Sequence, residues 1–222
     1  IDSVGIVTAR AGVNVSGGQL LVGTGVTIGV AGIATFRSGR IDVGDALHNT
    51  AVGEGAGDAV TTGAYNVAVG RNALTASTTG AQNTAVGNDA LEANTTGNNN
   101  TAVGKNALAA NTTASANVAV GRDALESNTT GANNTAIGYY ALTANTTANH
   151  NTAVGNQSLE ANTTGAQNTA VGKGSLEANT TGSNNTAIGY LALQTNTTGQ
   201  SNVALGRDAL LANTDADYNV AV

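Results

Sequence analysis

The chain has 222 residues and a formal net charge of −6, with 10% charged and 3% aromatic residues and no Cys, Met, Pro or Trp. The lack of Cys excludes disulfides, thiolate metal sites and cysteine nucleophiles. Its few Lys and Arg argue against nucleic acid as a partner, because phosphate binding needs clustered cations. No run of 18 apolar residues is present, so the sequence predicts no membrane span.

Residues 1–48 consist of short β-branched runs cut by glycine, in the stretches 4–10, 13–23, 26–29 and 32–44. This pattern is typical of strands and tight turns. The sequence therefore predicts a Gly-rich β segment as a first domain. Because Ile1 is not an initiator residue and the chain stops early in a repeat, we expect it to be a piece of a longer protein.

From Asn49 onward the sequence repeats every 17 residues, without insertion or deletion. The repeat reads Asn-(Thr/Val)-Ala-(Val/Ile/Leu)-Gly, then Ala-Leu, then Asn-Thr-Thr-Gly. A fixed period of this length is typical of a solenoid. We therefore expect an all-β parallel β-solenoid, or β-roll, over residues 49–222, with ten full 17-residue rungs and the start of an eleventh.

Each repeat is expected to contain a short strand that begins at Asn and ends at Gly, as in residues 83–87. Along this strand Thr84 and Val86 share one face, while Ala85 points to the other. The return segment 89–93 has helical propensity, so one short helix per rung is an alternative. We favour a second strand or an extended arm, because so short a helix is marginal by itself.

Three sets of residues recur once per rung and carry the structural predictions. A thin core is expected from Val86, Val103 and Val120 facing Leu91, Leu108 and Leu125. Side-chain amides one strand spacing apart can form hydrogen-bonded ladders. The expected ladders are Asn83, Asn100, Asn117 and Asn134 at the strand start, and Asn94, Asn111 and Asn128 at the turn.

The alanine in the middle of the strand never varies among the repeats, which suggests that it is pressed against another backbone or another subunit. A thin rung buries little apolar surface against the entropy of ordering its backbone, so we expect chains to associate, most simply as a homotrimer around a fibre axis. The predicted subunit interface is Ala85, Ala102, Ala119 and Ala136.

The repeat Asn-Thr-Ala-Val-Gly-x-x-Ala-Leu-x-x-Asn-Thr-Thr-Gly resembles repeats in tail-fibre and other virion structural proteins of marine bacteriophages, especially cyanophages. The opening stretch 3–13, with 17–23, resembles the same proteins. More distantly, Val67–Gly70 and Thr135–Gly138 look like the Ser-Val-Ala-Ile-Gly unit of trimeric autotransporter adhesin heads, whose usually shorter coils form a β-roll in a trimer. The resemblance implies a structural fibre located on a virion.

Several other patterns could indicate a binding or modification site. Thr95, Thr112 and Thr129 begin a hydroxyl column, which makes an ice-binding solenoid an alternative. Asn-x-Thr triplets match the N-glycosylation pattern, but a turn requirement explains them better. Basic residues follow the glycine and acids follow the leucine, which we interpret as solvated edges that discourage aggregation. Asp89, Asp123 and Asp208 lack the calcium-loop pattern, and His48 and His150 are isolated.

We therefore expect no catalytic residue, cofactor or metal site, and no enzyme. The expected function is a structural segment that extends and stiffens a phage tail fibre or virion appendage for host attachment. Its partners would be copies of itself and other fibre or virion proteins, with any host receptor bound by a region outside this chain. A bacterial surface adhesin stalk is the alternative.

Overall fold

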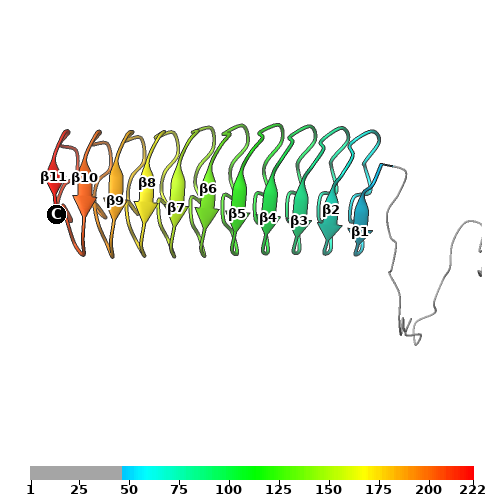
Figure 1. Ribbon diagram of the computed structural model, residues 1–222, viewed down its shortest axis with the longest axis horizontal. Coiled ribbons are helices and arrows are strands. Elements are labelled where there is room, and N and C mark those ends of the chain that lie inside the picture. The colour runs from blue at the N-terminus through cyan, green and yellow to red at the C-terminus, as the bar shows by residue number, and fades with distance from the viewer. Residues whose placement is uncertain (1–46) are drawn as a thin grey trace, which may run out of the picture. The chain divides into compact units, whose positions relative to one another are not determined.

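A computed structural model describes residues 47–222, so the predicted β segment over residues 1–48 lies almost entirely outside the described residues. The described part contains no helix and forms one parallel eleven-stranded sheet in chain order. Figure 1 shows the strands side by side, with a return loop after each. The strands are β1 Thr50–Val52, β2 Val67–Val69, β3 Thr84–Val86, β4 Thr101–Val103, β5 Val118–Val120, β6 Thr135–Ile137, β7 Thr152–Val154, β8 Thr169–Val171, β9 Thr186–Ile188, β10 Val203–Leu205 and β11 Val220–Ala221.

The register follows the sequence period without a slip. Thr84 pairs with Thr101 and Ala85 with Ala102, and every other strand pair has the same offset of 17 residues. One repeat is therefore one turn of a parallel β-solenoid, as the sequence predicted. At a strand spacing of about 4.8 Å, the ten steps from β1 to β11 span about 48 Å.

The return segment is neither the second strand that the sequence analysis favoured nor the alternative helix. Residues 88–93 are a series of turns in which Asp89 has φ 58° and Leu91 has φ 51°. Residues in this left-handed conformation cannot continue either a right-handed helix or an extended strand. The backbone still bonds to the next rung, since the Leu91 amide donates to the Ala107 carbonyl over 3.0 Å.

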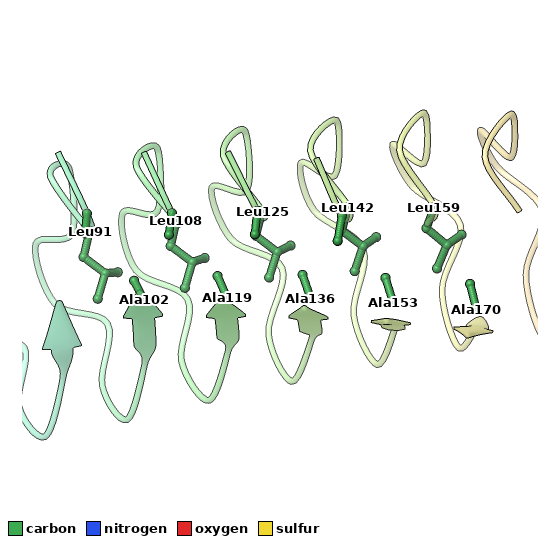
Figure 2. Close-up of a cluster of buried hydrophobic side chains, with 14 of the residues drawn as sticks. Leu91, Ala102, Leu108, Ala119, Leu125, Ala136, Leu142, Ala153, Leu159 and Ala170 are labelled. Atoms are coloured by element: carbon green, nitrogen blue, oxygen red, sulfur yellow. The ribbon is translucent and has the colours of Figure 1, made fainter. Parts of the chain in front are cut away.

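The core is made of alanine and leucine. Ala85 and Leu91 have no exposed surface, whereas Val86 is partly exposed. Figure 2 shows the leucine of each return segment pointing toward a strand alanine, as with Leu108 and Ala119. Burial of the leucine offsets the strain of its left-handed backbone, because a buried Leu side chain stabilises by about 1.5–3 kcal/mol.

Two predictions about the strand residues are therefore wrong. Ala85, Ala102, Ala119 and Ala136 are fully buried inside their own chain and cannot form a subunit interface. The valines expected in the core lie on the outer side of the strands and are only partly buried: Val86, Val103 and Val120. The leucines expected to face them do lie in the core: Leu91, Leu108 and Leu125. The return segment approaches the sheet so closely that only a methyl group fits between the strand and the leucine.

Candidate functional surfaces

The asparagines of the turn form a continuous ladder of side-chain amides, which we call the turn ladder. Asn111 Nδ2 donates to Asn94 Oδ1 over 2.8 Å, and Asn128 Nδ2 donates to Asn111 Oδ1 over 3.1 Å. The same amide nitrogen also donates to the carbonyl three residues later, as from Asn128 to Gly131 over 2.9 Å. The side chains of Asn94, Asn111 and Asn128 are fully buried, so the Asn-x-Thr triplets of these turns present no accessible amide in the folded chain.

The asparagines at the strand start are linked mainly through the backbone. The Asn100 amide N–H donates to Asn83 Oδ1 over 2.9 Å, and Asn83 Nδ2 donates to the Gly97 carbonyl over 2.8 Å. Asn117 and Asn134 repeat the first contact on the following rungs. These residues therefore tie each strand start to the rung before it and to the turn that closes their own repeat.

Ser77 occupies the turn-ladder position of the second rung, and its buried Oγ makes no hydrogen bond. We predict that Ser77→Asn stabilises the protein by about 1 kcal/mol, because an amide there can accept from Asn94 Nδ2 and donate to the Gly80 carbonyl. Thermal unfolding followed by circular dichroism should show a higher midpoint. Ser77→Ala, which removes the unpaired hydroxyl without extending the ladder, is the control, and an equal midpoint in both variants would contradict the prediction.

The threonine column considered for ice binding faces the solenoid itself. The Thr95 hydroxyl donates to the Thr112 carbonyl over 3.0 Å, and Thr112 and Thr129 donate to the next rung in the same way. These threonines are partly buried, and their hydroxyls are already used in hydrogen bonds to the next rung. The second threonine of each turn is exposed instead, at Thr62, Thr79, Thr96, Thr113, Thr130, Thr147, Thr164, Thr181 and Thr198.

The outer side of the sheet forms a regular uncharged surface, which we call the strand face. It consists of the first and third residues of the strands, which are Thr, Val, Ile or Leu on every rung. Ile137 and Ile188 are 40% and 42% exposed, although each is stacked between neighbouring rungs. The strand face was not found from the sequence, because the valines were expected inside.

All Lys and Arg residues among the described residues lie in one column, at the position after the strand glycine. This basic column consists of Arg71, Lys105, Arg122, Lys173 and Arg207. Tyr139 and Tyr190 occupy the same column, where the guanidinium groups of Arg122 and Arg207 lie 5.5 and 5.3 Å from their ring centres. The aspartates that the sequence analysis set aside as calcium ligands pair with arginines here: Asp89 with Arg71 at 3.8 Å, Asp123 with Arg122 at 2.8 Å and Asp208 with Arg207 at 3.2 Å.

The acids that follow the core leucine line a shallow groove along the return segments. One part of the groove has a volume of about 730 Å³ and is lined by Ala161, Ala178, Glu160 and Glu177 among others. Gln157 Nε2 donates to Glu160 Oε2 over 2.9 Å, and Gln194 Nε2 donates to Glu177 Oε2 over 2.8 Å. Burial, and to a lesser extent the Asp123 carboxylate, raises the pKa of Glu126 above its ordinary value of 4.5.

Within residues 47–222 no three His, Cys, Asp or Glu side chains lie close enough to hold a metal ion. His48 stacks on Tyr65, with the ring centres 5.3 Å apart. No helix in the same part of the chain is long and apolar enough to cross a membrane.

Comparison with protein-family models, with curated proteins and with solved structures finds no match to this chain. Its function is therefore inferred from the repeat and from the surfaces that the repeat creates.

Proposed function

We propose that this chain is a rigid spacer in an extracellular fibre, which extends and stiffens a phage tail fibre or another virion appendage. The observation that supports this role is the unbroken register of eleven strands, in which each rung makes the same contacts as the one before. In such a solenoid the number of repeats sets the length of the rod. The resemblance of the repeat to virion fibre proteins favours a virion over a bacterial adhesin stalk, which is the second candidate.

Stiffness has a structural basis in the three sets of bonds that connect successive rungs. The strands pair on one side, the turn ladder runs along another, and leucine and alanine fill the space between them. Bending the rod would stretch at least one of these sets, and each buried amide that lost its partner would cost about 1–3 kcal/mol. A rod held on several sides resists bending in every direction.

Within the fibre we propose a homotrimer that joins other fibre or virion proteins at its ends. Host attachment would then belong to a region outside this chain, which the rod holds away from the virion body. The ice-binding alternative was based on the threonine column that begins at Thr95. Those hydroxyls donate hydrogen bonds to the next rung, so the column no longer supports this alternative.

Removing two whole repeats tests the spacer role. Deletion of residues 118–151 joins Asn117 to Thr152 in phase, so the protein should fold and the rod should shorten by about 9.6 Å. Small-angle scattering gives the length, and circular dichroism gives the fold. Deletion of residues 118–143 is the control, because it breaks the register and should prevent cooperative folding.

The same in-phase deletion in the full-length fibre should shorten the appendage in electron micrographs while host attachment persists. If attachment were lost although the shortened fibre was folded and assembled, the repeats themselves would carry a binding site. That result would contradict the spacer role.

A further inference from the structure

The strand face has no charged residue on any rung. The basic column begins only two residues beyond the third strand position, and acids lie in the return segment that follows, as at Asp89 and Glu92. Charges therefore occur close to the strand face but never on it. An uncharged surface of Thr, Val, Ile and Leu that runs the length of a rod is depleted of charged residues in the same way as the central part of an interface.

The first strand position accepts either Thr or Val, which shows what this position needs. Val67 and Val118 replace threonine with no other change in the strand, and Val203 replaces it in the strand that ends at Leu205. The two side chains have nearly the same shape and differ in one hydroxyl, so the shape is required and the hydroxyl is not. A packing surface has this requirement, whereas a surface that uses an ordered array of hydroxyls does not.

The strand face becomes large enough for a stable interface when the column on either side of it is included. The surface from the residue two before the first strand position to the basic column is seven residues wide, so at about 3.3 Å per residue and about 4.8 Å per strand the eleven strands cover roughly 1,200 Å². A standard interface buries about 800 Å² on each partner. A partner that matches the whole strand face must repeat at the same spacing. A second copy of this chain does so, because it is built from the same rungs.

We propose that the strand face is the surface through which copies of this chain associate, side by side and parallel, around an axis that runs along the solenoid. The proposal rests on the proposed fibre function and replaces the alanine interface expected from the sequence. The strand face is only two side-chain columns wide. Three chains around one axis suit this width, because each chain offers one column to each neighbour.

The orientation follows from the residues on either side of the strand face. The basic column lies beyond the third strand position. Before the first position lies a neutral column that contains no Lys, Arg, Asp or Glu: Tyr65, Gln82, Asn99, Ala116, Asn133, His150, Gln167, Asn184, Ser201 and Tyr218. Rotation about the solenoid axis places the basic column of one chain beside the neutral column of the next. An antiparallel pairing would place basic column against basic column, and this like-charge contact disfavours it.

The first experiment places charge on the strand face. In Val103→Glu with Val154→Glu, the new carboxylates point outward, so each chain should still fold while association weakens by at least about 100-fold. Thr113→Glu with Thr164→Glu is the matched control, because it adds the same charge to the same two rungs at exposed turn positions. Sedimentation velocity should show three chains for the parent protein and the control, and one chain for the strand-face variant.

Circular dichroism on the same samples shows whether each variant is folded. A parent protein that is folded and monomeric at tens of micromolar would overturn the proposal, and so would equal loss of association in both variants. A folded monomer that inhibits ice recrystallisation would assign the strand face to ice instead. These outcomes leave the rung-deletion test unaffected, so failure of the interface and failure of the spacer role are distinguishable.

The second experiment measures orientation in the parent background. The chain has no native Cys, so Thr96→Cys, Thr147→Cys and Thr198→Cys each carry a single spin label, at exposed positions three rungs apart. In a parallel assembly the three variants should give the same label-to-label distance. An antiparallel pair would separate the labels of the outer two variants by about 29 Å along the axis, and this result would overturn the proposed orientation.

Discussion

Gly121→Ala is expected to lower the free energy of unfolding by at least about 4 kcal/mol, for two independent reasons. Gly121 has φ +133°, a conformation that residues with a Cβ atom essentially do not adopt. A Cβ atom would also lie 2.5 Å from the carbonyl oxygen of Gly138 on the next rung. Neither problem can be relieved without moving one rung away from the next, which would break the strand register on both sides.

Gly174→Asn is the matched control, because Gly174 also has positive φ but lies in the ordinary left-handed region at +65°. The equivalent residues Asn72 and Asn106 have φ 55° and 56°, so this place in the rung already accepts asparagine. A Cβ atom at Gly174 would lie 2.6 Å from Leu191 Cδ2, but this is the end of a flexible side chain that can turn aside, so the expected change is within about 1 kcal/mol. Chemical denaturation followed by circular dichroism measures both variants, and similar losses in the two would show that the strain at Gly121 is not the cause.

Asn128→Ala is expected to cost about 3–5 kcal/mol, because it interrupts the turn ladder in the middle of the solenoid. The variant loses the bonds from Asn128 to Asn111 and to the Gly131 carbonyl, and the bond that Asn128 accepts from Asn145. Asn111 Oδ1 then has no side-chain donor from the next rung although it is fully buried. Thermal unfolding followed by circular dichroism should show a large fall in the midpoint.

Two further variants separate the ladder from the general effect of changing the turn. Thr130→Ala changes an exposed side chain two residues away and should shift stability by no more than about 0.5 kcal/mol. Asn128→Asp keeps the shape but places a buried carboxylate opposite Asn111 Oδ1. It should be least stable at neutral pH and should recover partly near pH 4, where the carboxyl can be protonated and donate. A pH-independent loss would contradict the ladder explanation.

The sequence determined the architecture because the repeat has a single period with no insertion. A constant offset of 17 residues permits one parallel register. The period alone therefore predicted the solenoid, the leucine column and the two asparagine sets. The structural need for glycine after each strand could also be predicted from the sequence. A position that accepts no side chain on any rung indicates a backbone conformation or a close contact that excludes a Cβ atom. The columns of basic and acidic residues were also visible, although only as solvated edges.

Only the tertiary structure decided which side of the strand faces inward. Alternation along the strand divides its residues into an alanine side and a Thr/Val side, but alternation does not say which side is buried. Hydrophobicity favours burying valine, whereas the distance between sheet and return segment allows only alanine, because Leu91 and its equivalents fill the space. That distance depends on left-handed turns at Asp89 and Leu91, which local propensity does not predict. The Thr and Val side chains form an outer surface because the space between the sheet and the return segment is too narrow for them.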